Sequence, residues 1–162
     1  HLGAYMVIAA SILGGMVLAR WPADGRKRLY LMDDPMAALN VLEYRSGEPA
    51  LNWHFDRSEF TTTLLLCAAD CGGEFQYRSA LRTANGPNFE GVAALLADDD
   101  PEIRTLPMTA GTLCIFRGVE TAHRVTPVTG TRSRIVAVLS YYERPGVRFS
   151  KAERLGFYGR VE

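Results

Sequence analysis

The stretch "LNWHFDRSEFTTTLLL", residues 51–66, places a histidine and an aspartate two positions apart, just ahead of an apolar run typical of a strand. In an extended chain, side chains at positions i and i+2 point to the same face. The imidazole of His54 and the carboxylate of Asp56 would therefore project side by side, while Phe55 points the other way. A pair of this kind raises the question of a third group elsewhere in the chain.

The composition is that of one globular domain. The chain has 162 residues, of which 48% are hydrophobic and 22% charged, which excludes a disordered protein. Eighteen basic residues balance eighteen acidic ones, which argues against nucleic acid or an acidic membrane surface as a partner. Three cysteines, Cys67, Cys71 and Cys114, do not form a disulfide framework. They indicate reduced thiols and a cytoplasmic protein.

The N-terminal segment is apolar. Residues 2–19 carry no charge, and Arg20 closes the run. Eighteen apolar residues lie at the lower limit for a membrane-spanning helix. Glycine and serine interrupt the run, and no basic residue precedes it. We therefore favour a buried or artefactual segment over residues 1–20, with a membrane anchor as the alternative, ahead of a domain at residues 21–162.

The rest of the chain reads as short strands broken by turn residues. One helix is expected in "NFEGVAALLADDD", residues 88–100, with Phe89, Val92, Ala93 and Leu96 on its apolar face. The triple aspartate at 98–100 is expected to be a solvated loop rather than a calcium site, because the alternating oxygen ligands of a calcium loop are missing. The pattern predicts a mainly β protein, a sandwich or jelly roll. The expected strands are residues 38–44, 50–54, 60–68, 74–78, 103–107, 112–116, 121–128 and 132–143.

A third ligand is available at His123, which with His54 completes the internal histidines of the chain. Two histidines and one carboxylate can occupy one face of an octahedral iron and leave three positions open. Zinc prefers a tetrahedral, closed or nearly closed shell. His54, Asp56 and His123 are therefore the expected ligands of a non-haem Fe(II) ion.

Two arginines follow His123 in "HRVTPVTGTRSRI", residues 123–135. On a strand, Arg132 and Arg134 would point to the same face. A guanidinium there could hold a carboxylate through a two-pronged hydrogen bond while the other end of that molecule binds the iron. The sequence alone leaves open which arginine does so.

Several of these segments together resemble one enzyme superfamily. The segments "WHFDR", "GGEFQYRSALR", "GTLCIFRG", "HRVTPVTGTRSRIVAVLSYYERPGV" and "FYGR" look like those of the Fe(II)/2-oxoglutarate-dependent oxygenases. More narrowly, they resemble the bacterial branch that contains free amino-acid hydroxylases and lysine-type radical halogenases. The resemblance runs from about Asp33 to Arg160.

The resemblance implies a double-stranded β-helix, a distorted jelly roll, with one or more flanking helices. It implies iron bound by His54, Asp56 and His123, and 2-oxoglutarate bound by Arg134 or Arg132. Fe(II), 2-oxoglutarate and O2 would be required, with ascorbate as an optional reductant. In the halogenases a glycine or alanine replaces the carboxylate ligand, so Asp56 favours hydroxylation over halogenation.

The resemblance also suggests a substrate, namely a small molecule and most simply a free cationic or polar amino acid. Glu59, Glu74 and Arg78 lie near the ligand-bearing strands and could pair with ammonium and carboxylate groups. Arg57 and Trp53, which flank the ligand pair, are further candidates for substrate binding. A peptide or another metabolite is the alternative.

Two other classes of function remain. One is a cupin-like metal protein that does not use 2-oxoglutarate, although cupins favour more histidine ligands. The other is an inactive truncated remnant, because members of the resembling branch carry a longer N-terminal region and often have a glutamine where Cys67 stands. The basic and aromatic residues of "GVRFSKAERLGFYGR", 146–160, favour a C-terminal cap on the barrel over nucleic-acid binding.

Overall fold

The computed structural model describes residues 16–21, 25–83 and 85–161, with side chains described from residue 28 onward. Nine strands and two helices lie in these ranges. They are β1 (Met16–Trp21), β2 (Gly25–Leu31), β3 (Leu39–Tyr44), β4 (Phe60–Cys67), β5 (Phe75–Arg78), α1 (Phe89–Leu96), β6 (Arg104–Leu106), β7 (Leu113–Phe116), β8 (Ala122–Val125), β9 (Arg134–Tyr142) and α2 (Lys151–Tyr158).

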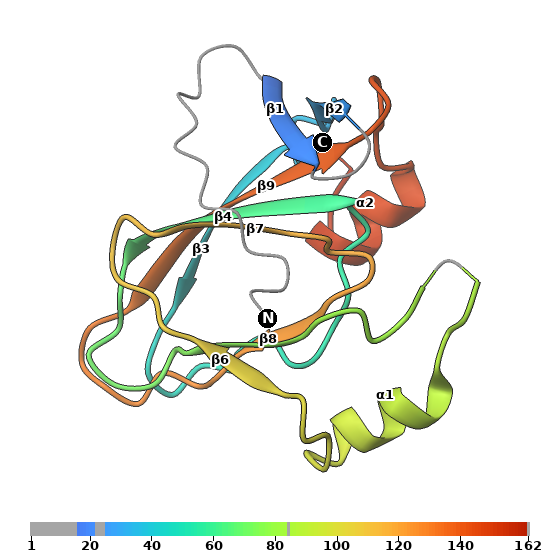
Figure 1. Ribbon diagram of the computed structural model, residues 1–162. Coiled ribbons are helices and arrows are strands. Elements are labelled where there is room, and N and C mark those ends of the chain that lie inside the picture. The colour runs from blue at the N-terminus through green and yellow to red at the C-terminus, as the bar shows by residue number, and fades with distance from the viewer. Residues whose placement is uncertain (1–15, 22–24, 84, 162) are drawn as a thin grey trace.

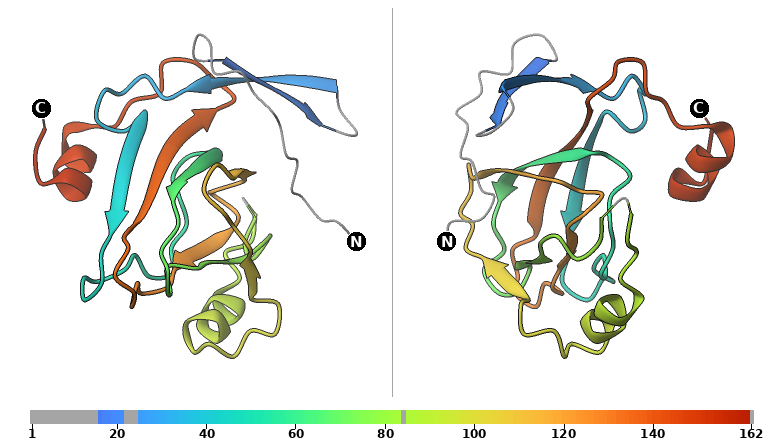
Figure 2. Two further views of the ribbon diagram at one scale, coloured as in Figure 1. Left: turned by 90° about the vertical axis from the view of Figure 1, so that its left-hand side faces the viewer. Right: turned by 45° about the vertical axis from the view of Figure 1, so that its right-hand side comes forward.

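The strands form two antiparallel sheets. The larger sheet has the order β1-β2-β9-β4-β7, with β3 also paired to β9, and the smaller sheet has the order β6-β5-β8. Helix α1 lies at the small-sheet end of the molecule, and α2 lies at the opposite end beside the larger sheet (Figures 1 and 2). The mainly β class is confirmed; the double-stranded β-helix stays a prediction.

The space between the sheets is filled by a buried cluster of Phe75, Cys114, Phe116 and Val125. Strand β4 contributes alternate residues to this side, because side chains alternate across a strand. Thr61 of β4 is paired with Phe116 of β7 and is itself buried. The inner face therefore holds both an apolar core and hydroxyl groups next to it.

Both helices have capping residues that explain where they begin. Asn88 accepts a hydrogen bond from the backbone N–H of Gly91 at the start of α1. Ser150 and Glu153 form a reciprocal capping box at the start of α2. The expected apolar face of α1 is right at Val92, which packs against the buried cluster of Leu81, Leu95 and Ala122, and wrong at its other residues. Leu95 is its buried residue, whereas Phe89 and Leu96 are exposed.

Most expected strands are present, and three differ. The expected strand at 50–54 is absent: only His54 makes an isolated bridge there. Strand β8 ends at Val125, and β9 begins at Arg134 rather than at Arg132. The expected loop at 98–100 is present: Asp98 and Asp99 are exposed, and Asp98 and Asp100 form ion pairs with arginines.

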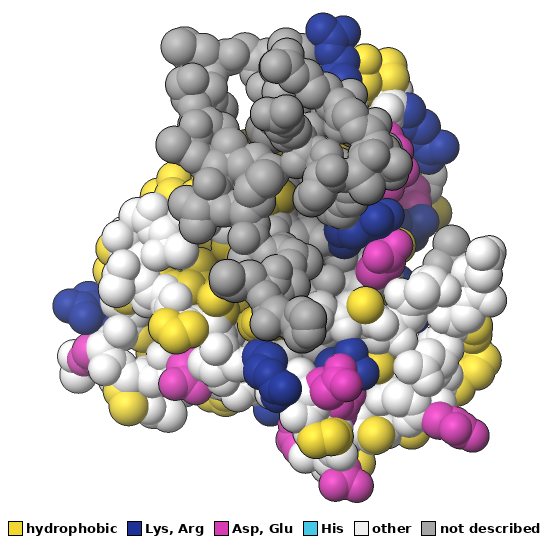
Figure 3. Space-filling view, viewed as in Figure 1, with side chains coloured by type: hydrophobic (Ala, Val, Ile, Leu, Met, Phe, Trp, Pro, Cys, Tyr) yellow, Lys and Arg dark blue, Asp and Glu magenta, His cyan; other side chains and the backbone are white. Residues whose placement is uncertain are grey.

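The N-terminal apolar segment lies largely outside the described residues. Its described end belongs to β1, which pairs with β2. No helix in the described part of the chain is long and apolar enough to cross a membrane. On the face drawn in Figure 3, acidic and basic side chains lie next to each other at several places, as the balanced net charge leads one to expect.

Candidate metal centre

The two internal histidines are joined through their backbones. The N–H of His54 donates to the carbonyl of His123 at 3.1 Å, and the N–H of His123 donates to the carbonyl of His54 at 3.0 Å. Residues that exchange both bonds are directly opposite, so their side chains project to the same face. The ring centroids are 4.1 Å apart. The bridge thus places His54 beside β8, on the edge of that strand that does not pair with β5.

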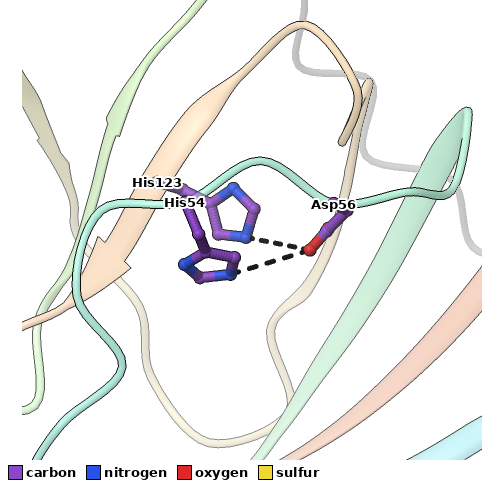
Figure 4. A group of neighbouring side chains, drawn as sticks. All are labelled: His54, Asp56 and His123. Carbon is purple, nitrogen blue, oxygen red and sulfur yellow. Dashed lines mark ion pairs between the residues drawn. The ribbon is translucent and has the colours of Figure 1, made fainter. Parts of the chain in front are cut away.

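Asp56 lies two residues along the same extended segment and turns its carboxylate toward both rings (Figure 4). Its Oδ1 is 3.6 Å from Nε2 of His54 and 3.5 Å from Nε2 of His123. The three ligand atoms all lie within 4.8 Å of one another, and no other such group occurs among the described residues. The structure therefore brings together the three residues that the sequence indicated as ligands.

Backbone carbonyls orient both rings. Nδ1 of His54 is 2.7 Å from the carbonyl of Asn52, and Nδ1 of His123 is 3.0 Å from the carbonyl of Thr121. Because a carbonyl only accepts, each Nδ1 must carry the proton in these contacts. The lone pair of each neutral ring is then on Nε2, the atom that faces Asp56.

The protonation equilibria suit ligand binding. Burial lowers the pKa of His54 and the charge of His123 lowers it further, against smaller opposing effects of Asn52 and Asp56. Burial raises the pKa of the Asp56 carboxyl, but hydrogen bonding to His123, its charge, the Thr61 hydroxyl and the charge of His54 together lower it by more. At neutral pH the site thus offers a neutral His54 imidazole and an ionised carboxylate.

The two separations between Asp56 Oδ1 and the histidine Nε2 atoms are close to ligand spacings around a first-row metal ion. A metal about 2.1 Å from each atom would place neighbouring ligands about 3.0 Å apart in an octahedron and about 3.4 Å apart in a tetrahedron. The separations of 3.5 and 3.6 Å are within a few tenths of an ångström of the second value. One imidazole pair and one carboxylate leave coordination positions free in either geometry.

Arg134 carries a buried guanidinium. It begins β9, is only 3% exposed, and lies over the ring of its cross-strand neighbour Tyr44 at 5.6 Å. Its Nη1 is buried without a hydrogen-bond partner, and no ion pair joins it to a carboxylate within the described residues. Burial lowers its pKa, yet an arginine keeps its charge in proteins. A buried, unpaired cation of this kind is a binding position for an anion.

A pocket of about 360 Å³ adjoins Arg134. Its wall includes Leu65, Phe75, Glu74 and Thr112. The ring of Phe75 also lies 5.6 Å from the ring of His123. One side chain thus borders both the pocket and the candidate metal centre.

Arg132 lies elsewhere, so the expectation that both arginines share one face of a strand is wrong. Asp70 accepts hydrogen bonds from the backbone N–H groups of Thr131 and Arg132 and from the Thr131 hydroxyl. This turn precedes β9. It leaves Arg132 exposed, with its Nε donating to the carbonyl of Ala68 at 2.8 Å.

Of the candidate substrate-binding residues, one lines the pocket and the others lie away from it. Glu74 is exposed on the pocket wall. Arg57 points away to α2, where its Nη2 is 2.6 Å from Glu153. Trp53 packs in the buried cluster near α1. Arg124 covers its ring at 4.5 Å.

The other two residues named from the sequence already have partners. Arg78 forms ion pairs with Asp100 and Glu102. Glu59 accepts a hydrogen bond from the backbone N–H of Glu143.

Sequence reasoning missed three residues around Asp56. Thr61 donates a hydrogen bond to its second carboxylate oxygen, Ser58 contacts Thr61, and Gly118 packs against both Asp56 and Thr61. The alternation of β4 could have indicated Thr61, since it fixes which threonines share a face. Gly118 comes from a distant turn, and nothing near it in the sequence indicates its contact with Asp56.

The proteins similar to this chain are distant solved structures. No family model and no curated protein matches the chain. The similar solved structures include a 2OG-Fe(II) oxygenase family oxidoreductase from Burkholderia pseudomallei, at 19% identity and a TM-score of 0.44 over 74% of this chain and 44% of that one. A prolyl-4-hydroxylase from Pseudomonas putida matches at 19% identity and a TM-score of 0.44, over 65% of this chain and 52% of the other.

A third similar structure is the PvcB protein from Pseudomonas aeruginosa, at 10% identity and a TM-score of 0.49 over 77% of this chain and 66% of that one. This chain therefore spans 44% to 66% of the length of these three proteins. Likeness at this level does not by itself assign an activity to the chain.

Proposed function

We propose that this protein is a non-haem Fe(II)/2-oxoglutarate-dependent dioxygenase that hydroxylates an unactivated C–H bond of a small molecule. In the proposed reaction, R–H, 2-oxoglutarate and O2 give R–OH, succinate and CO2. Bound Fe(II) would supply the activation of O2, which couples the decarboxylation of 2-oxoglutarate to oxygen insertion. The chain contributes the ligands, a clamp for the co-substrate and a shielded position for the substrate.

The donor set supports Fe(II). His54 and His123 present their Nε2 atoms, and Asp56 presents Oδ1 at the same point. This is the facial set of two histidines and one carboxylate that leaves positions open for further ligands. With Asp56 as the third ligand, the three open positions are those that a chelating 2-oxoglutarate and O2 would take, so none remains for a halide. We therefore propose hydroxylation rather than halogenation.

The observation that supports 2-oxoglutarate as the co-substrate is the buried Arg134. Its Nη1 has no partner, its charge is uncompensated among the described residues, and it lines a pocket. Phe75, on the wall of that pocket, lies 5.6 Å from the ring of His123. A dicarboxylate would supply both the missing hydrogen-bond acceptor and the missing negative charge at Arg134. One carboxylate would accept from the guanidinium, and the other end would reach the metal. Arg132, exposed and turned to the Ala68 carbonyl, does not offer this environment.

For the substrate we propose a free amino acid, cationic or polar. Glu74 supports this because it lies on the pocket wall and forms no ion pair within the described part of the chain. Arg57, Arg78 and Glu59 are each engaged by other groups. They are weaker candidates.

The experiment begins with anaerobic metal titration. Wild-type protein should bind about one Fe(II) per chain, and His123→Ala should lose most of that affinity. Zn(II) and Mn(II) titrated alongside test the choice of metal. Unchanged Fe(II) affinity in His123→Ala would disprove the ligand assignment.

The second stage measures turnover. Succinate release is screened across the twenty amino acids and a metabolite panel, and mass spectrometry detects a gain of one oxygen. Coupled turnover with a lysine- or arginine-like substrate, lost in Glu74→Gln through a raised KM, is the expected result. Iron binding with no consumption of 2-oxoglutarate would favour a cupin-like protein instead, and absence of metal binding would favour a remnant.

A further inference from the structure

The two oxygen atoms of the Asp56 carboxylate have different surroundings. Oδ1 faces the two histidines, at 3.6 and 3.5 Å from their Nε2 atoms. Oδ2 instead accepts a short hydrogen bond from the hydroxyl of Thr61. Oδ1 is therefore the oxygen that faces the candidate metal position. Oδ2 is held by the larger sheet, since Thr61 belongs to β4.

The hydrogen bond has a defined direction. An ionised carboxylate only accepts, so the single hydroxyl proton of Thr61 goes to Oδ2. The Thr61 oxygen is also 2.7 Å from Oγ of Ser58. Ser58 must then donate to Thr61, which gives a chain from Ser58 through Thr61 to Asp56. The hydroxyl-bearing residues of this chain are only 3% and 2% exposed, so bulk water does not compete for these bonds.

Gly118 permits this arrangement. Its carbonyl accepts from the N–H of Asp56 at 3.0 Å, which brings the two backbones together. A Cβ at this position would lie 2.5 Å from the Thr61 hydroxyl oxygen and 2.6 Å from the Asp56 Cβ. Both distances are well inside van der Waals contact. A side chain at residue 118 would therefore displace the carboxylate or the hydroxyl that holds it.

We propose that Thr61 is a positioning residue that restricts Asp56 to one-atom metal binding through Oδ1, with Ser58 orienting Thr61 and Gly118 providing the space. A carboxylate bound through both oxygens would occupy an additional coordination position. Holding Oδ2 on Thr61 keeps that position free for a chelating co-substrate and O2. This inference rests on the proposed metal centre.

The test compares Thr61→Val with two matched variants. Valine keeps the shape and removes the hydroxyl, whereas Thr61→Ser keeps the hydroxyl. Thr62→Val is the control, because Thr62 is 4% exposed on the same strand and its side chain alternates to the opposite face. Urea unfolding of each variant verifies that the fold is retained.

The first readout is the binding of Co(II) and, anaerobically, of Fe(II). Loss of a group that orients a ligand typically costs about 10- to 100-fold in metal affinity. We expect that loss in Thr61→Val, near wild-type affinity in Thr61→Ser and Thr62→Val, and a smaller loss in Ser58→Ala. The second readout is the visible absorption of the Co(II) protein, which weakens as the coordination number rises. It should fall in Thr61→Val and not in Thr62→Val.

Three results would overturn the proposal. One is wild-type Co(II) affinity and absorption in Thr61→Val. Another is an equal loss in Thr61→Val and Thr62→Val, which would show a general effect of removing buried hydroxyls. If Thr61→Val does not fold, Ser58→Ala decides: unchanged affinity there also contradicts the proposed chain. Failure of the wild-type protein to bind either metal is a different outcome, because it removes the metal centre itself.

Discussion

Replacing Arg134 by methionine should affect ligand binding and stability in opposite directions. The side chain is 3% exposed and its Nη1 already has no partner, so methionine removes a buried charge and fills similar space. In the ligand-free protein, this exchange should leave the free energy of unfolding unchanged or higher, because an unpaired buried charge is costly. With 2-oxoglutarate present, the same exchange leaves the distal carboxylate of the co-substrate buried without a cation.

The loss of affinity can be bounded. Removing one partner of a buried charge pair costs about 2 to 5 kcal/mol, and each 1.36 kcal/mol corresponds to about tenfold. The dissociation constant of 2-oxoglutarate should therefore rise by about 30-fold to about 5,000-fold. Since Arg134 is almost fully buried, we expect the upper half of this range. Arg134→Lys keeps the charge without the two-pronged geometry. Its dissociation constant for 2-oxoglutarate should therefore lie between those of the wild-type protein and Arg134→Met.

The assay is calorimetric titration of 2-oxoglutarate into the anaerobic Fe(II) protein, together with urea unfolding of the metal-free protein. Arg132→Met is the matched control, because Arg132 is exposed before β9 and should change affinity less than about twofold. The reasoning is refuted if the two methionine variants bind 2-oxoglutarate equally well. It is also refuted if Arg134→Met strongly destabilises the ligand-free protein, because Arg134 would then be a structural residue.

Three further predictions concern separate parts of the molecule. Asp56→Gly should lose most succinate formation and open a position for chloride, and a wild-type enzyme that gave chlorinated product by mass spectrometry would contradict the role of Asp56. Asp34→Asn should lower the free energy of unfolding in urea by about 3 kcal/mol, because the buried carboxylate accepts from Arg154 and two backbone N–H groups. Burial raises the pKa of Asp34, but these bonds lower it by more, to below 3.8. Its stabilising effect is therefore present above about pH 3.8 and is lost as the pH falls further. An equal loss of unfolding free energy at low pH in Asp34→Asn and wild type would disprove this. Burial raises the pKa of Cys114 to about 11, so thiol reagents at neutral pH should label exposed Cys71 first and Cys114 only on unfolding, as peptide mass spectrometry can measure.

The candidate ligand set could be proposed from sequence because it depends on residue type and a local spacing. His54 and Asp56 are two residues apart, and the geometry of an extended chain brings their side chains to one side. His123 followed from the scarcity of histidine rather than from any pairing signal. The backbone bridge that joins His54 to His123 is long-range, and no pattern near either residue indicates it.

The distinction between Arg132 and Arg134 could not be predicted, because it depends on where β9 begins. Alternation gives both residues the same face only if both are in the strand. Asp70, far away in sequence, holds the turn before β9 with three hydrogen bonds and so excludes Arg132 from the strand. The start of the strand is thus determined by a tertiary contact.

Helix α1 shows the same limit for packing. Its length and position followed from local spacing, and Asn88 provides the capping group. Its buried face did not, because Phe89 and Leu96 satisfy a helical period as well as Leu95 does. The cluster against which α1 packs includes Ala122, which the sequence places far away. Tertiary contacts select one of two faces that periodicity leaves equivalent.

The segment that carries His54 and Asp56 has no strand of its own, and its position comes from separate contacts on three sides. The His54 bridge ties it to β8 of the smaller sheet, and the hydrogen bond from Thr61 ties Asp56 to β4 of the larger one. Arg57 adds an ion pair to α2. A ligand set held by both sheets keeps its geometry only while the sheets keep theirs. The apolar cluster around Phe75 between the sheets therefore supports the candidate metal centre as well as the core.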